Sequence, residues 1–336
     1  MKTRTLDGRI NTGTPGVRRI PAPGRTMAFP THRTRAAKQA GVAFAVLSCL
    51  IALPTGCDSL RPERENALVA RSTDPAPQSP HTTAIAEPGK FQTRSGCCVF
   101  YTDFEIDKKE PLFAELETLP EQISADLKLP LSNSIVQVYL FDTQENYERF
   151  MFTPKVGRYC NQPARRAYFF ALPHFGGPDD LKVYTWLGEP NTLRTDLRHE
   201  LTHAILHGIL KDVPLWLDEG LASYFELPPA NDGVNPLHLE VLRSGPFEPD
   251  LAKLEPLRKV KDMQKPEYRE AWAWVHFMLR GDPAARKVLQ DYLQLLRTST
   301  TPGSLEAKLR EVYPDPSRFL IEHLQRVALP RLRHGS

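Results

Sequence analysis

The sequence contains little cysteine and lacks the close cysteine pairs that hold structural zinc. Its 336 residues include five cysteines, and none of them forms a C-x-x-C motif. This disfavours a Cys–His zinc site. Cys97, Cys98 and Cys160 belong to the region that we expect to fold, and in an oxidising compartment one of the adjacent pair could bridge to Cys160. Because neighbouring strand residues point to opposite faces, only one of the two could do so easily.

Long hydrophobic runs are also missing. The uncharged apolar stretch at 40–53 has fourteen residues, which is short for a bilayer-spanning helix but suits the core of a signal peptide. It follows a basic stretch and leads into L-P-T-G-C, which ends at Cys57. This arrangement resembles a bacterial lipoprotein box, in which Cys57 is acylated and becomes the mature N-terminus. A cleaved secretory signal and a buried N-terminal helix are the alternatives.

The N-terminal quarter of the chain divides into three segments by composition. Met27 gives a signal peptide of more ordinary proportions than Met1 does, so residues 1–26 are interpreted as an over-extended gene start or a disordered leader. Residues 27–57 are then the signal peptide, and residues 58–90, rich in Pro, Ser and Thr, form a flexible linker. We therefore expect an extracytoplasmic bacterial protein of the cell envelope, tethered to the membrane through its N-terminus or secreted.

Positive charge is scarce outside the leader. Residues 1–38 hold nine Lys/Arg and one acid, whereas the remainder of the chain has 34 Lys/Arg against 39 Asp/Glu. A protein built to bind nucleic acid carries its basic charge on the folded part, so that class is set aside.

The apolar periodicity after the linker predicts one domain at 91–330 with an α+β fold. Its first part, 91–190, is a sheet subdomain, and 191–330 is a mainly helical subdomain. The predicted strands are 97–104, 134–141, 167–172 and 182–187. The predicted helices are 110–127, 145–152, 192–210, one that begins near Pro214, and four more at 267–280, 284–297, 304–313 and 317–327.

Two histidines stand four residues apart in L-R-H-E-L-T-H, with a glutamate directly after the first. An α-helix turns about 100° and rises about 1.5 Å per residue, so His199 and His203 lie about 40° and about 6 Å apart and can reach one ion. Glu200 lies on the flank of this row, where it can reach a water bound to the metal. An H-E-x-x-H motif thus combines two ligands with a general base. The alternative is a solvated helix face that carries two histidines.

The next segment is predicted to supply the third ligand. Residues 213–226 read V-P-L-W-L-D-E-G-L-A-S-Y-F-E, and Glu219 follows His203 by sixteen residues. A short turn can bring this second helix back antiparallel to the first, so that Glu219 faces both histidines. Two histidines and a carboxylate leave the fourth tetrahedral position for water, as in catalytic zinc sites. Gly220 costs a helix roughly 1 kcal/mol against Ala, which indicates a close approach there.

H-E-L-T-H followed by W-L-D-E-G-L-A-S-Y-F-E resembles the gluzincin zinc metallopeptidases and is very similar to the N-E-G-F-A-S-Y-F-E segment of the zinc aminopeptidases. The wider layout, with V-F-Y-T-D-F in front and Y-R-E-A-W-A-W-V-H-F-M-L behind, resembles the peptidase MA-like family over most of 97–297. The resemblance implies a zincin-like fold that hydrolyses a peptide or protein substrate. It also implies one Zn²⁺ on His199, His203 and Glu219, with Glu200 as the base.

Other roles near the motif are assigned with alternatives. The place of Tyr268 downstream of Glu219 resembles that of the gluzincin tyrosine that stabilises the oxyanion; a packed tyrosine that opens a helix is the alternative. Tyr224 and His238 are weaker candidates for that role. His207 is two helical turns from His199 and is expected to line the pocket or pack rather than bind the metal.

Asp196 and Asp218 could each orient a ligand histidine by accepting a hydrogen bond from it without binding the metal themselves. For Asp196 we favour a solvated carboxylate. Asp218 also stands where the aminopeptidases have Asn, and no G-A-M-E-N segment precedes the motif. The device that captures a free substrate amino terminus is therefore not visible, which favours endopeptidase or narrow-substrate hydrolysis.

Three functions are compatible with these patterns. The first is a zinc metallopeptidase of the cell envelope, which the complete set of chemical groups favours. The second is a catalytically weak or inactive zinc-binding envelope protein with a peptide-binding or scaffolding role. The third is a structural lipoprotein without metal.

Overall fold

The computed structural model describes residues 86–157, 165–172 and 177–329. The interpretations of residues 1–85, which include the signal peptide, Cys57 and most of the linker, lie outside the described residues, as does Cys160. Cys97 and Cys98 carry free thiols whose sulfur atoms are 3.8 Å apart. None of the helices in the described ranges is long and apolar enough to span a membrane.

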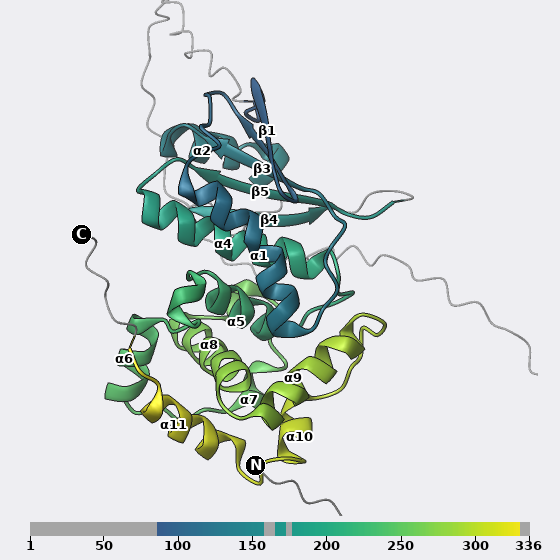
Figure 1. Cartoon of the computed structure of the whole chain (residues 1–336), viewed down its shortest axis with the longest axis vertical. Coiled ribbons are helices and arrows are strands. Elements are labelled where there is room, and N and C mark those ends of the chain that lie inside the picture. Colours follow the sequence, from purple (N-terminus) through teal and green to yellow (C-terminus); the bar gives the residue numbers. More distant parts are fainter. Residues whose placement is uncertain (1–85, 158–164, 173–176, 330–336) are drawn as a thin grey trace, which may run out of the picture. The chain divides into compact units, whose positions relative to one another are not determined.

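A five-stranded mixed sheet forms the first part of the described chain (Figure 1). Its order is β1-β2-β3-β5-β4, with β2, β3 and β5 parallel and the two outer strands antiparallel to their neighbours. The strands are β1 (Phe91–Ser95), β2 (Cys98–Thr102), β3 (Val136–Phe141), β4 (Ala167–Leu172) and β5 (Asp180–Trp186). Strand β4 therefore lies at an edge of the sheet in the described part of the chain.

Side chains of the central strand β3 alternate between two hydrophobic clusters, one on each face of the sheet. Val138 and Leu140 of β3 join the main hydrophobic core, whereas Tyr139 and Phe141 join a smaller aromatic cluster. Successive strand residues point to opposite faces, so the two sets belong to opposite sides. Helices α1 (Pro111–Leu127) and α2 (Gln144–Met151) contact the sheet, and the short α3 (Pro154–Gly157) packs on α2.

The C-terminal half is mainly helical, which confirms the predicted α+β class. Its helices are α4 (Pro190–His207), α5 (Leu215–Phe225), α6 (Pro236–Ser244), α7 (Leu251–Leu254), α8 (Lys265–Arg280), α9 (Pro283–Leu296), α10 (Leu305–Arg310) and α11 (Pro316–Arg326), with 3₁₀ turns η1 (Pro229–Asn231) and η2 (Val260–Asp262). Helix α4 contacts β4, β5, α1 and α5, so it lies between the sheet and the helical half (Figure 1).

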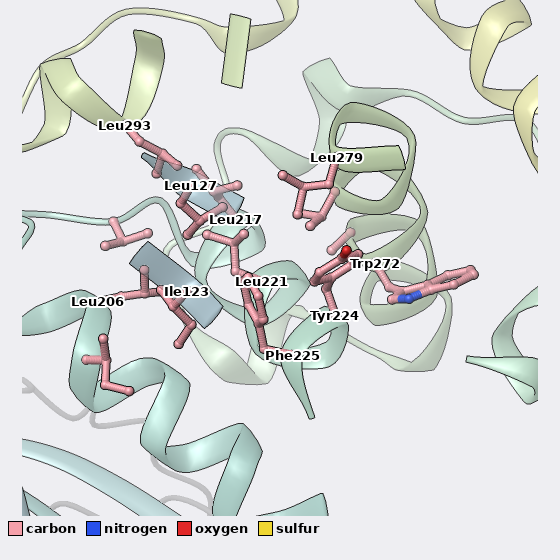
Figure 2. Packing of buried hydrophobic residues seen from close by; sticks show 14 of the residues in the cluster. Ile123, Leu127, Leu206, Leu217, Leu221, Tyr224, Phe225, Trp272, Leu279 and Leu293 are labelled. Carbon is pink, nitrogen blue, oxygen red and sulfur yellow. The ribbon is translucent and has the colours of Figure 1, made fainter. Parts of the chain in front are cut away.

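The main core is continuous from the sheet into the helical half. Figure 2 shows residues of four helices packed together in it: Ile123 and Leu127 of α1, Leu217, Leu221 and Phe225 of α5, Trp272 and Leu279 of α8, and Leu293 of α9. At roughly 25 cal/mol per Å² of apolar surface, burial of such side chains is the main force that holds α5 in place.

Several elements differ from the sequence prediction at their ends or were not predicted. Strand β1 and helices α6 and α7 were missed. Strand β1 has a single large apolar residue and buries only Ser95, α7 has just four residues, and the apolar residues of α6 mostly alternate with polar ones instead of following a helical period. Helix α4 ends at His207 rather than 210, and a side chain at Gly208, which caps it, would meet the Ser132 hydroxyl at 2.6 Å.

The close approach predicted at Gly220 is confirmed. A Cβ at this position of α5 would lie 2.7 Å from the carbonyl oxygen of Ala271 on α8. Because the obstacle is helix backbone, the two helices would have to separate. We expect Gly220→Ala to lower the free energy of unfolding by about 1–3 kcal/mol although alanine is the better helix former, as measured by chemical denaturation. Gly89→Ala is the matched control, since nothing lies within 4 Å there; equal stability of Gly220→Ala and wild type would contradict the packing argument.

A buried histidine pair links α8 to α11 and predicts a pH dependence of stability. Nδ1 of His276 lies 2.9 Å from Nε2 of His323. Burial, with nearby positive charge from Arg280 and Arg326, lowers the pKa of His276 to about 3 and that of His323 to about 4.

Because these pKa values are lower in the folded than in the unfolded chain, folding favours the neutral form of both histidines. The contribution of the neutral pair to the free energy of unfolding is complete above about pH 6.5 and is lost as the pH falls toward the pKa values of the folded chain. The two histidines together should lower the free energy of unfolding by about 1–3 kcal/mol between pH 7.5 and 5.5. His323→Gln should reduce this fall. The same pH dependence in wild type and variant would argue against the pair as its source.

Candidate metal centre

Helices α4 and α5 carry the motif residues, and a buried arginine ties them together. The Arg198 side chain is fully buried directly before His199. Its Nε donates to the carbonyl oxygen of Phe225 at the end of α5 (2.9 Å), and its other nitrogens reach Glu115 (3.2 Å) and Gln122 (2.8 Å) on α1. These bonds hold α4 against both neighbours at the level of the first predicted ligand.

The three predicted ligands converge. His199 Nε2 lies 3.5 Å from Glu219 Oε2, and His203 Nε2 lies 3.8 Å from the same oxygen. One ligand atom from each of the three residues lies within 4.8 Å of the other two, so the group could hold a metal ion. Bond lengths of about 2.0–2.2 Å in a tetrahedral site correspond to about 3.3–3.5 Å between ligand atoms. The observed spacing is therefore slightly wider than a bound zinc requires.

Two of these atoms are buried polar groups without a hydrogen-bond partner. They are His199 Nε2 and Glu219 Oε2. Leaving a buried donor or acceptor unpaired costs about 1–3 kcal/mol, so such atoms need a ligand of another kind. The two atoms lie 3.5 Å from each other, at ion-pair distance, and a cation held by both would take the place of that contact. The side chains thus fit a metal ion chemically as well as geometrically.

Each histidine has a carboxylate on its far side. His199 Nδ1 donates to Glu226 Oε2 at 3.0 Å, since a carboxylate can only accept, and Asn235 holds the other oxygen of Glu226 at 3.2 Å. Asp218 Oδ2 lies 2.9 Å from His203 Nδ1, in an ion-pair contact rather than a hydrogen bond. With Nδ1 facing a carboxylate, Nε2 of each ring can face the metal. Such outer partners orient a ligand ring and raise its basicity.

The carboxylates also shift the titration of the histidines. Burial by itself would lower the pKa of His199, but its contacts with Glu219 and Glu226 raise that pKa well above the ordinary value. For His203, burial is likewise outweighed by Asp218, and the pKa is raised. Burial would raise the pKa of Glu219, yet His199, His203 and Arg165 lower it. Without metal, the site therefore attracts protons, which compete with a cation for the same atoms.

A cavity of about 320 Å³ opens beside the three ligands. Glu200, His203 and Glu219 line it, so the predicted base faces the same space as the ligands. Its other wall comes from edge strand β4, where Phe169 stacks on the ring of His203 at 6.1 Å between centroids. A substrate in this cavity would contact the ligand helices on one side and β4 on the other.

The three candidates for stabilising the oxyanion have different surroundings in the structure. Tyr268 is half-buried in the first turn of α8, and its pKa is raised to about 12 by burial and then by the negative charges of Glu219 and Glu200. Tyr224 is buried against Gly233 and Phe225, and His238 packs on the ring of Trp272. None of the three lines the cavity. Of the three, Tyr268 is the one on which both Glu219 and Glu200 act.

The neighbouring residues occupy three different roles. His207 lines the cavity and lies outside the ligand group, with Nε2 3.1 Å from Asp218 Oδ2, as expected. Asp218 contacts the predicted ligand His203, which favours a role in orienting that ring over a solvated carboxylate. Asp196 is not a free solvated carboxylate: its Oδ2 accepts from Arg166 Nε at 2.8 Å.

Sequence reasoning missed Glu226, Arg198 and Arg165. A signal for Glu226 was present, since it follows Glu219 by seven residues, two helical turns along the same face. No local pattern distinguished Arg198 from a surface arginine of a polar helix. Arg165 is remote in sequence from the motif and comes to the cavity only through the position of β4.

Glu226→Gln should lower metal affinity about 10–100-fold, because the amide orients His199 without the negative charge that makes Nε2 a stronger ligand. The dissociation constant can be measured by competition with a chromogenic chelator. Asp196→Asn is the control: this carboxylate is on α4 but pairs with Arg166, so its loss should leave the affinity unchanged. Equal affinities for Glu226→Gln and wild type would show that Glu226 does not support the metal.

No protein-family model matches the chain, and no curated protein matches it either.

Proposed function

We propose that the protein is a zinc-dependent metallopeptidase of the gluzincin type that hydrolyses peptide bonds in the cell envelope. The observation that carries this proposal is the convergence of His199, His203 and Glu219, with unpaired buried atoms, beside a cavity that His203, Glu219 and Glu200 line. The resemblance of the two motif segments to the gluzincins supports it independently.

The composition of the ligand group favours zinc over harder cations. Two imidazole nitrogens and one carboxylate oxygen form a catalytic zinc set, whereas calcium and magnesium prefer oxygen ligands alone. When bound, a zinc ion supplies a Lewis acid that polarises a carbonyl and makes water a nucleophile near neutral pH.

The residues of the chain perform the proton transfers around that ion. Glu200 accepts the proton of the attacking water and delivers it to the amine that leaves when the peptide bond breaks. Tyr268 keeps its phenolic proton at neutral pH, since its pKa is about 12, and can donate a hydrogen bond to the oxyanion. Glu226 and Asp218 hold the two imidazoles in position.

The edge strand supports a peptide as the substrate. Tyr168, Phe169, Phe170 and Ala171 of β4 line the cavity, and among the strands that the structure describes β4 pairs with β5 alone. The backbone groups on its other side can pair with an extended peptide, which would place a peptide bond next to the ligands.

The test is cleavage of a mixed set of fluorogenic peptides by the purified protein, together with its metal content. We expect about one zinc per chain, activity that a chelator removes, and recovery on addition of zinc. A protein that binds no metal, or that binds zinc and cleaves none of the peptides, would contradict the proposal.

A further inference from the structure

Arg165 brings a positive charge into a cavity that is otherwise acidic. It lies two residues before β4 and lines the cavity with Glu200, Asp218 and Glu219, three carboxylates of the ligand helices. Among the lining residues of the described chain it is the one Lys or Arg. Neither the ligand set nor the proton transfers described above require it.

The guanidinium of Arg165 has no carboxylate at ion-pairing distance among the residues that the structure describes. Its carbon lies 5.6 Å from the ring centre of Tyr168, and its main-chain oxygen accepts from the Tyr147 hydroxyl at 2.8 Å, which holds the backbone. Glu219 and Glu200 still act on it at longer range: burial would lower the pKa of Arg165, and the two carboxylates raise it. Arg165 therefore lines the cavity with a guanidinium that no described carboxylate pairs with, which leaves capacity for an anion.

We propose that Arg165 is a specificity-determining residue that binds a carboxylate of the peptide substrate near the scissile bond. This inference rests on the proposed peptidase function and names the substrate class: peptides with a free C-terminal carboxylate or an acidic side chain beside the cleaved bond. Guanidinium and carboxylate form two parallel hydrogen bonds, a geometry that lysine cannot reproduce.

The experiment compares four matched peptides, all cleaved at one bond: a free C-terminal acid against its amide, and an internal Glu against Gln. We expect wild type to prefer at least one carboxylate form in kcat/KM. Arg165→Met should reduce that preference about 10-fold or more, the size of a charge-assisted hydrogen bond, and leave the uncharged peptides nearly unchanged. Arg165→Lys should restore part of it. Arg166→Met is the neighbouring control, because Arg166 pairs with Asp196 and stacks on Trp186.

Binding supplies a second readout. Zinc-loaded Glu200→Gln protein should bind the preferred carboxylate peptide more tightly than its neutral partner, and adding Arg165→Met should abolish the difference. Preference for the free terminus or for the internal Glu identifies the source of the carboxylate, and either supports the inference. No charge preference in wild type overturns it, as does an equal loss for all four peptides in Arg165→Met, which would assign Arg165 to the transition state. Failure of wild type to cleave any peptide would instead refute the proposed function.

Discussion

Replacing Glu200 with Gln should lower kcat for peptide hydrolysis about 10²–10⁴-fold and leave the zinc content unchanged. The amide has nearly the shape of the carboxylate but cannot accept the proton of the attacking water. Glu200 is buried at the cavity wall and is not one of the three converging ligands, so its loss should not affect metal binding. The measurements are single-turnover rates and metal content of the same preparation.

The outcome separates a peptidase from a zinc-binding protein without catalytic function. Activity unchanged in Glu200→Gln would rule out the proposed proton transfers even if the metal is present. Loss of both zinc and activity would show that Glu200 has a structural or ligand role. His207→Gln is a useful companion, because His207 lines the same cavity but is neither base nor ligand; we expect it to keep its zinc and most of its activity.

Glu219→Gln should produce the largest loss of metal. Glu219 Oε2 is the atom shared by both histidine contacts, and the side chain is buried. A neutral amide oxygen is a weaker ligand, so affinity should fall by more than the about 10–100-fold expected when an outer partner such as Glu226 is changed. Competition with a chelator gives the dissociation constants, and far-ultraviolet circular dichroism checks that the variant is folded.

The order of the three affinities is the informative result: wild type highest, Glu226→Gln intermediate and Glu219→Gln lowest. An affinity of Glu219→Gln equal to that of wild type would mean that the metal is held elsewhere. If Glu219→Gln does not fold, its circular dichroism should be compared with that of wild type after the metal has been removed by a chelator. The metal-free wild type contains the same buried histidines without a cation, so the comparison separates the effect of losing the metal from the effect of the substitution.

Local features of the fold were predictable because they depend on short-range periodicity. The 3.6-residue spacing of apolar residues placed α1, α8 and α9 within a few residues of their observed ends. Asp282 caps α9 by accepting from Ala284 N, and Pro283 occupies the first helical position. Strand β1 was not predictable. It is stable through pairing with β2 rather than through burial of its own side chains.

The close approach at Gly220 was also predicted, because a glycine inside a helix is costly without such a contact. The convergence of Glu219 with the two histidines was predicted as well, because a short turn brings the second helix back along the first. Which other carboxylates reach the histidines was not. Asp196 stands three residues before His199 and Asp218 fifteen residues after His203, yet the more distant Asp218 contacts His203 and Asp196 pairs with Arg166. The difference depends on the packing of α4 on β4 and α5.

The sequence by itself determined the spacing of His199, Glu200 and His203, because the geometry of a helix leaves no freedom in that row. It also determined that a carboxylate sixteen residues on could face them. Only the tertiary structure decided the surroundings: Glu226 behind His199, Arg198 clamped to α1, and Arg165 across the cavity on the approach to β4. These contacts join residues far apart in the chain, and their distances are set by how the core packs, which no local pattern records.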